Sequence, residues 1–175
     1  MHASLATLIL SCAPLVHPTT LLGMIRVESA GNPFAVSVNR PQGLADAGIE
    51  VPDFEQPRTR AEALQLIERL AARGYSTSVG LVQINIEHLQ VMQVGLAQLL
   101  DPCTNIALAQ RILLACDSGQ TREPNTSAQV RLRRTLSCYN SGHYRARSGS
   151  RYARDVARAA ERQRRAVLAL ARSGA

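Results

Sequence analysis

The sequence has no tryptophan and no lysine, and aromatic residues make up only 3% of its 175 residues. So few aromatic side chains argue against a protein that stacks the bases of single-stranded nucleic acid on its surface. No apolar run reaches the ~18 residues of a membrane span, so no transmembrane segment is predicted. The apolar stretch 5–10 has no basic residue before it and is a poor leader peptide. We interpret it as the first helix of the mature protein or as a clipped leader.

The cysteines form no Cys-x-x-Cys pair, and their spacings do not match a zinc site. They are Cys12, Cys103, Cys116 and Cys138. In an oxidising compartment, four cysteines allow three disulfide pairings. His88 and His143 have no partner at ligand spacing, so we assign both to the surface or to packing. No metal or cofactor is predicted.

The charge of the chain is concentrated in its last third. The length fits one domain, at most with a tail, and the 46% hydrophobic content excludes wholesale disorder. All 20 basic residues are arginines. Residues 1–121 hold 7 arginines and 10 acids, whereas residues 122–175 hold 13 arginines and 3 acids. This distribution fits an anionic partner such as nucleic acid, lipid headgroups or a cell-wall polymer.

Apolar spacing and capping signals predict a series of helices with one short extended piece. We expect helices over residues 18–29, 60–73, 86–95, 102–118, 128–140 and 151–172, an irregular loop over 34–58, and an extended stretch over 80–85. A capping-box pattern at 59–62 precedes the second helix, in which Ala71 is predicted to face inward. Leu132 is predicted to face inward in the fifth helix. The predicted fold class is α+β, mainly α.

Glu28 is the most informative single residue. It lies on the same helical stripe as Leu21 and Ile25, beside a break at residues 30–33. A carboxylate on an apolar face is desolvated, which we expect to raise its pKa and let it hold a proton near neutral pH. A general acid needs that property. The alternative is a carboxylate that swings into solvent at a fraying helix end.

The segment 80–85 (Gly-Leu-Val-Gln-Ile-Asn) carries two amides. If the segment is extended, Gln83 and Asn85 share one face. Paired amides suit the recognition of hydroxyl and acetamido groups, because each amide both donates and accepts hydrogen bonds. Gly80 would let a polymer approach the backbone closely. The alternative is an ordinary amphipathic strand.

A third polar segment follows at 139–142 (Tyr-Asn-Ser-Gly). Tyr139 ends an inward stripe, so its hydroxyl points into the structure and needs a partner. Asn140 stands at a helix end before Ser-Gly, which is a common C-cap arrangement. Alone, this segment is weak evidence for any function.

Together these segments resemble the lytic transglycosylases of the soluble-transglycosylase, lysozyme-like superfamily. The matching motifs are Glu28-Ser29, the segment 80–85 and the segment 139–142, in the order and spacing of that family. Residues 101–106 (Asp-Pro-Cys-Thr-Asn-Ile) and 12–14 (Cys-Ala-Pro) resemble its subgroup from type IV secretion and conjugation systems.

The resemblance covers about residues 12–156, where Tyr152 and Val156 match a closing Tyr-x-x-x-Val motif. The chain departs from the family at Val82, where Met is frequent, and at Cys138, where Ala is frequent. The resemblance implies a goose-type lysozyme/transglycosylase domain over 12–157 with a small extended piece, followed by an Arg-rich helical tail over 158–175.

The resemblance also implies a reaction: cleavage of the β-1,4 bond between N-acetylmuramic acid and N-acetylglucosamine, leaving a 1,6-anhydro end. Glu28 would protonate the leaving oxygen and then act as base on the muramic 6-hydroxyl. Gln83 would hold an acetamido group, while Tyr139 and Asn140 would orient Glu28 and the sugar. The further expected substrate-binding residues are Ser37, Gly80 and Asn85. The implied partners are peptidoglycan strands and secretion-system proteins in the periplasm or cell envelope, with no nucleic acid.

Two rival functions remain open from the residues. Two-carboxylate glycosidases need a second acid about 5–10 Å from the first. No acid lies between Ser29 and Leu44, and the segments 80–85 and 139–142 hold none, which favours a single-acid mechanism. A muramidase that uses water would take its second carboxylate from the loop 46–55, whose acids are Asp46, Glu50, Asp53 and Glu55. The other rival is a scaffold or nucleic-acid-binding module built on the Arg-rich end.

The resemblance further implies a Cys12–Cys103 disulfide, because the subgroup carries cysteines at both places. Cys116–Cys138 would be the second bond, although Cys138 falls off the inward stripe of its helix. We expect the tail after Val156 to bind wall or membrane anions. The alternative for the tail is a solvated face that packs only Val167, Leu168 and Leu170.

Overall fold

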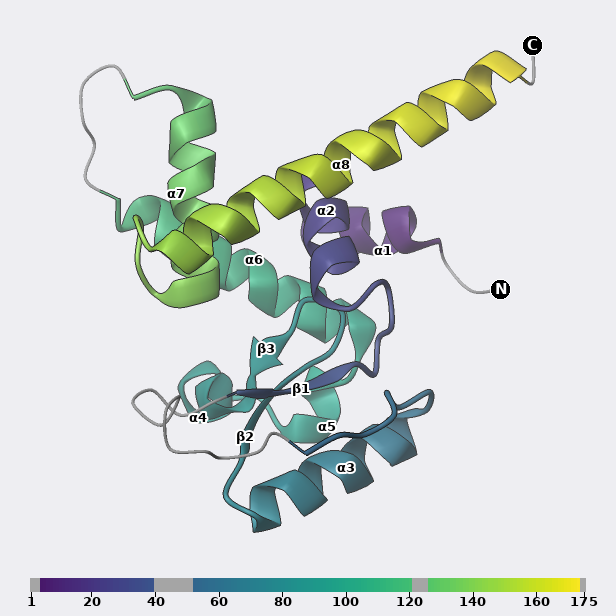
Figure 1. The fold of residues 1–175 in the computed structure, drawn as a ribbon, viewed down its shortest axis with the longest axis vertical. Helices are drawn as coiled ribbons and strands as arrows, with labels where there is room; N and C mark the ends of the chain where they lie inside the picture. The colour runs from purple at the N-terminus through teal and green to yellow at the C-terminus, as the bar shows by residue number, and fades with distance from the viewer. Residues whose placement is uncertain (1–3, 40–51, 121–125, 174–175) are drawn as a thin grey trace. The chain divides into compact units, whose positions relative to one another are not determined.

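The computed structural model describes residues 4–39, 52–120 and 126–173, with side chains as far as residue 166. The chain forms two compact units. Residues 28–108 form what we term the sheet unit, and residues 1–27 with 109–175 form the terminal unit. Helices predominate, and the strands of the described residues all lie in the sheet unit (Figure 1). The expectation of an α+β, mainly helical fold is confirmed.

The described part of the sheet unit contains a three-stranded antiparallel sheet in the order β1-β2-β3. Its strands are β1 (Val36–Asn39), β2 (Ser76–Val79) and β3 (Ile84–Asn85). The strand β1 corrects the expectation of an irregular loop over 34–58, and β2 was not anticipated. Both strands have only four residues and pair with partners about 40 positions away, so local periodicity carries little signal for them.

The two faces of the sheet differ in polarity. Val36, Val79 and Ile84 are directly opposed across the three strands, and all three are buried. The adjacent row consists of Ser37, Ser78 and Asn85. Because successive side chains of a strand point to opposite faces, this second row belongs to the other, polar face. We call it the polar row.

The helix α3 (Arg60–Ala72) packs against β1 and β2. It begins with the expected capping box, in which the Thr59 side chain accepts from the Glu62 N–H and the Glu62 side chain accepts from the Thr59 N–H. Ala71, which was predicted to face inward, is exposed, whereas Leu66 is buried. The core-facing stripe therefore lies to one side of the predicted one.

The single helix predicted over 86–95 is absent from the structure. In its place lie a 3-10 turn, η1 (Ile86–His88), and two short helices, α4 (Leu89–Met92) and α5 (Leu96–Leu99). Gln93 adopts a left-handed conformation with φ of 56°, which ends α4. The helix α6 (Pro102–Ser118) follows as predicted, with Asp101 accepting from the Thr104 N–H at its start.

The other helices are α1 (Leu5–Cys12), α2 (Pro18–Glu28), α7 (Ala128–Ser141) and α8 (Arg147–Ser173). Within the terminal unit, α7 packs against α8 (Figure 1). Glycines permit two close approaches. A Cβ atom on Gly149 would lie 2.7 Å from the Ser137 Cα, and one on Gly23 would lie 2.7 Å from the Val156 carbonyl oxygen. These glycines therefore set how closely α8 approaches α7 and α2.

Two expectations for α7 and α8 need correction. The last helix begins at Arg147 rather than at 151. Leu132 on α7 is 42% exposed instead of facing inward, so that the apolar stripe of this helix is shorter than predicted. The side chains of Val167, Leu168 and Leu170 lie outside the described residues.

The cysteines are all oxidised. Cys116 is bonded to Cys138, Cys12 and Cys103 are also disulfide-bonded, and no cysteine is free. The Cys116–Cys138 bond joins α6 to α7 across 22 residues of sequence, within the terminal unit.

Replacing Cys116 and Cys138 together by serine is expected to lower the free energy of unfolding by about 3 kcal/mol, because a loop of this length is released in the unfolded chain. Urea unfolding followed by circular dichroism measures the change. An unchanged denaturation midpoint with an unchanged slope would show that this bond does not contribute to stability.

Candidate functional site in the sheet unit

Glu28 is the last residue of α2, and its surroundings match the predicted stripe. Ile25 and Leu21 are buried one and two turns before it, respectively, and Glu28 itself is half-buried. The helix ends because Ala30 and Gly31 adopt positive φ angles of 52° and 92°. A helix that stops at this point leaves the carboxylate at its last turn.

Ser29, the residue after Glu28, is hydrogen-bonded to the segment 80–85. Its hydroxyl donates to the Leu81 carbonyl oxygen at 2.8 Å, and this bond is partly buried. The hydrogen bond spans 52 residues of sequence. Two of the three predicted motifs, Glu28-Ser29 and 80–85, are therefore joined directly in the structure.

Residues 80–83 form a turn, and only Ile84 and Asn85 are extended. Gly80 has a φ of 86° and Gln83 a φ of 51°, both in the left-handed region. The Gly80 N–H donates to the Ala35 carbonyl at 2.9 Å, and the Gln83 N–H closes the turn onto the Gly80 carbonyl at 3.3 Å. The expectation of a continuous extended stretch is corrected, because a strand cannot contain two left-handed residues.

The side chain of Gln83 is held by this turn. Its Nε2 donates to the Ala35 carbonyl at 3.1 Å and to the Gly80 carbonyl at 3.0 Å. Both amide hydrogens are therefore used within the protein, and Gln83 is half-buried. The Oε1 atom accepts no hydrogen bond from the described residues, which leaves it as an acceptor for a ligand N–H or O–H.

The buried side chain of Asn105 holds the turn 80–83 through hydrogen bonds, and this residue was assigned no role from the sequence. It is 1% exposed, and its Oδ1 accepts from the Val82 N–H at 3.0 Å. Its Nδ2 donates to the carbonyls of Val79 and Leu99, each at 3.1 Å. Asn105 lies one helical turn before Ala109 on the inward stripe of α6, so a polar residue at an apolar position was the available signal.

The polar row brings two further predicted residues together. Ser37 lies opposite Ser78, and Ser78 lies opposite Asn85, so Ser37 and Asn85 are one strand apart on the same face. Asn85 Oδ1 accepts from the Ser76 hydroxyl at 3.2 Å and from the Glu87 N–H at 2.9 Å. Ser37 is exposed and Asn85 half-buried. This face offers hydroxyl and amide groups to a polar ligand.

Tyr139 and Asn140 belong to the terminal unit. Tyr139 stacks on Tyr152 with ring centroids 6.3 Å apart. Asn140 is exposed and lines a hollow of about 670 Å³. Asn140 is not the C-cap; Gly142 is, with a φ of 72° and its N–H donated to the Cys138 carbonyl at 2.7 Å. That Tyr139 and Asn140 act together with Glu28 stays a prediction.

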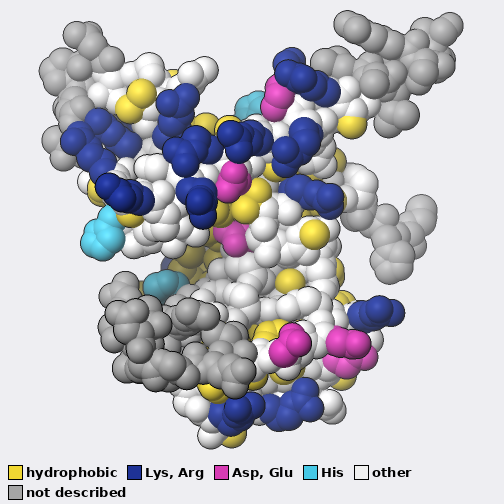
Figure 2. Space-filling view, in the orientation of Figure 1, with side chains coloured by type: hydrophobic (Ala, Val, Ile, Leu, Met, Phe, Trp, Pro, Cys, Tyr) yellow, Lys and Arg dark blue, Asp and Glu magenta, His cyan; other side chains and the backbone are white. Residues whose placement is uncertain are grey.

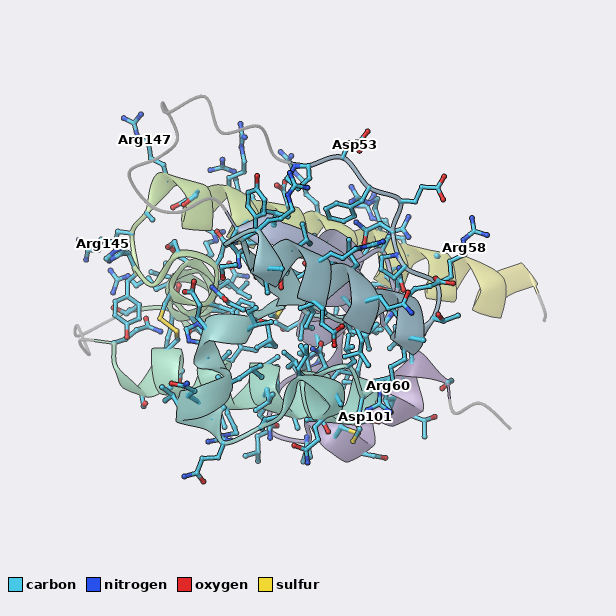
Figure 3. The ribbon with its side chains drawn as sticks, turned by 90° about the horizontal axis from the view of Figure 1, so that it is seen from below. Asp53, Arg58, Arg60, Asp101, Arg145 and Arg147 are labelled. Carbon is cyan, nitrogen blue, oxygen red and sulfur yellow. A yellow bond between two sulfur atoms is a disulfide. The ribbon has the colours of Figure 1, made fainter. Side chains whose placement is uncertain are left out.

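The other acids that the structure describes in the sheet unit are poor rivals for Glu28. Among the acids described between residues 28 and 108, Glu28 alone is half-buried, and the others are exposed. Figure 3 shows Asp53 with its carboxylate directed outward. The Arg58 N–H donates to the Glu62 Oε2 at 2.7 Å, and because this bond favours the charged carboxylate it holds the pKa of Glu62 below its usual value. Asp46 and Glu50 lie outside the described residues.

No cluster of metal-ligating side chains occurs in the described parts of the chain. His88 and His143 are both exposed. None of the described helices is long and apolar enough to cross a membrane.

Comparison with known proteins gives a consistent result. A family model described as a transglycosylase SLT domain matches residues 9–161. The "Type IV secretion system protein virB1" of Brucella suis biovar 1 is 32% identical over 133 residues, which cover 76% of this chain and 52% of that protein. The "Protein virB1" of Agrobacterium fabrum is 32% identical over 151 residues, which cover 86% of this chain and 56% of that protein.

The chain spans about half the length of the curated relatives that it matches. No solved structure matches it. The family model covers most of the chain, including every motif on which the lysozyme-like expectation depended. The chain therefore belongs to the family of transglycosylase SLT domains.

Proposed function

We propose that this chain is a lytic transglycosylase that cleaves the β-1,4 bond between N-acetylmuramic acid and N-acetylglucosamine in peptidoglycan. The observation that carries the proposal is Glu28. It is the one half-buried acid among those described in the sheet unit, and its neighbour Ser29 is bonded to the turn that carries Gln83. A single acid suits a reaction in which the substrate supplies its own nucleophile.

In this reaction Glu28 acts twice. Its protonated carboxyl donates a proton to the glycosidic oxygen, and the bond from that oxygen to the muramic C1 breaks. The resulting carboxylate then removes the proton from the muramic 6-hydroxyl, whose oxygen bonds to C1. The products are a 1,6-anhydromuramic end and a free 4-hydroxyl on the leaving sugar, so no water is consumed and Glu28 regains its proton.

The other predicted residues bind the glycan strand. Gln83 Oε1 accepts from the N–H of an acetamido group, because the Nε2 of this side chain is already bonded within the turn. Ser37 and Asn85 on the polar row bind sugar hydroxyls, and the buried Gly80 permits the turn that presents Gln83. Tyr139 and Asn140 orient Glu28 and the sugar.

The relatives suggest the setting. The Brucella suis relative is named as a type IV secretion system protein, which supports a role in opening the cell wall for a secretion or conjugation apparatus. Secretion-system proteins would be partners there. The four bonded cysteines fit an oxidising compartment, so we place the protein in the periplasm or cell envelope.

The test is the chemical identity of the products. Purified peptidoglycan is digested with the protein, and the released fragments are analysed by mass spectrometry before and after borohydride treatment. Anhydro ends are lighter than reducing ends by one water and resist borohydride. Fragments that gain hydrogen on reduction would instead indicate the water-using muramidase. A digestion with the Glu28→Gln protein controls for contaminating enzymes.

A further inference from the structure

A basic groove runs along the terminal unit. Two hollows of about 670 and 600 Å³ are formed by α7, α8 and the segment between these helices. Arg145, Ser150 and Arg154 line both hollows, so the two adjoin. We call the combined surface the basic groove.

Arginine dominates the lining of this groove. Arg145, Arg147, Arg151 and Arg154 line the first hollow. The second hollow adds Arg133, Arg134 and Arg158. Among the described residues, Asp155 is the only acid that lines either hollow, and its Oδ1 lies 3.9 Å from the Arg158 Nη1. Figure 2 shows the arginine side chains gathered over α7 and α8.

The arginines of α8 follow one face of the helix. Arg147, Arg151, Arg154 and Arg158 are spaced by three or four residues, and the first and last are about 16 Å apart along the axis. Figure 3 shows Arg145 and Arg147 projecting outward from the start of α8 and the segment before it. The guanidinium groups that line the groove repel one another, and a bound anion would reduce this repulsion.

The arginines farther along α8 have a different environment. Arg164 and Arg165 both bind Glu161, at 2.9 and 2.7 Å. The hydrogen bonds from Arg164 and Arg165 lower the pKa of Glu161 to about 2, so this carboxylate stays ionised near neutral pH. Among the described residues, no carboxylate pairs with Arg147, Arg151 or Arg154 of the groove, whereas Glu161 pairs with both Arg164 and Arg165.

We propose that the basic groove binds the carboxylates of the peptide stems that branch from the muramic acid residues of peptidoglycan. This inference rests on the proposed function, because it concerns the same substrate. Asn140, a predicted sugar-binding residue, also lines the first hollow, so the stem of a sugar bound at Asn140 would begin beside the arginines. Guanidinium groups bind carboxylates through paired, charge-assisted hydrogen bonds.

The shape of the groove favours a peptide over other anions. A membrane surface is broad and would meet a convex basic face, whereas these hollows are concave and sized for a small ligand. Single-stranded nucleic acid requires stacking platforms. The aromatic residues of the lining are Tyr144 and the buried Tyr152.

The experiment measures binding without catalysis. A fluorescent stem tetrapeptide with free carboxylates is titrated with the full chain, and anisotropy gives Kd. The test variant is Arg151→Gln with Arg154→Gln, and the matched control is Arg164→Gln with Arg165→Gln. Both pairs remove two charges from the same helix, and glutamine preserves helix propensity. Parallel titrations use the fully amidated peptide, oligothymidylate and phosphatidylglycerol vesicles.

We expect Kd for the acidic peptide to rise about tenfold in the test variant and to change less than about twofold in the control. Wild-type protein should bind the amidated peptide at least tenfold more weakly. Equal weakening in both variants, or tighter binding of oligothymidylate or vesicles than of the peptide, would overturn the proposal. Because the peptide contains no sugar, its binding is independent of whether products carry anhydro ends, and each proposal can fail alone.

Discussion

Glu28→Gln is expected to reduce the release of soluble fragments from peptidoglycan by at least about 10²–10⁴-fold while leaving the fold intact. Glutamine keeps the shape of the side chain at the end of α2 but neither gives nor takes the proton. Removing a general acid–base group typically costs this much in rate, and more where one group serves both steps. The measurement is the initial rate of fragment release, with circular dichroism and the unfolding midpoint as the check on folding.

The acids of the rival mechanism provide the control. Asp46→Asn, Glu50→Gln, Asp53→Asn and Glu55→Gln should each change the rate less than about threefold, because in the proposed reaction none of these carboxylates transfers a proton. Asp53 and Glu55 are exposed in the structure. A loss comparable to that of Glu28→Gln in any one of them would replace the single-acid mechanism by a two-carboxylate hydrolysis.

The elements that were predicted correctly are those with local signals. The capping box at Thr59 and Glu62 and the Asp101 cap at the start of α6 act within one helical turn. Gly142 ends α7 by its own left-handed conformation. Such features can be read from a few consecutive residues, and α2, α3, α6 and α7 were accordingly placed within a few residues of their observed limits.

The elements that were missed depend on distant residues. The strand β1 exists because Val36–Asn39 pairs with Ser76–Val79, and because the Gln56 side chain bonds both the N–H and the carbonyl of Val36. The break of the predicted helix 86–95 depends on Gln93 adopting a left-handed conformation, which is uncommon for any residue with a side chain. Neither feature has a periodic pattern of its own.

The candidate site shows the same division. The motif residues Glu28, Gln83 and Asn85 were identified from the sequence, but the shape of the turn between Gly80 and Gln83 was not. That shape depends on Asn105, which is 20 or more positions away in sequence and bonds the turn and its flanking strand from within the core. A sequence pattern therefore indicated the candidate side chains, while the support that positions them became visible only in the structure.

A side chain at position 80 would disrupt the hydrogen bonds by which Asn105 holds the turn. A Cβ atom at this position would lie 2.3 Å from the Asn105 Nδ2, and the φ of 86° is unfavourable for any side chain. Gly80→Ala is expected to lower the free energy of unfolding by about 3–5 kcal/mol. The left-handed strain accounts for roughly 1–2 kcal/mol, and the displaced Asn105 leaves buried backbone groups without partners at about 1–3 kcal/mol each. Urea unfolding measures the change.

Gly74→Ala is the matched control, because Gly74 has a φ of 80° and nothing lies within 4 Å of its Cβ position. Gly74→Ala should show the cost of the left-handed strain alone, about 1–2 kcal/mol.

Asn105→Ala should also lower the free energy of unfolding, by roughly 2–4 kcal/mol, since it removes three buried hydrogen bonds. When Asn105→Ala is added to Gly80→Ala, the further loss of stability should be smaller, because removing the Asn105 side chain also removes its overlap with the new Cβ atom. If Gly80→Ala costs no more than Gly74→Ala, then Asn105 does not fix the turn that holds Gln83, and the positioning of Gln83 must have another source.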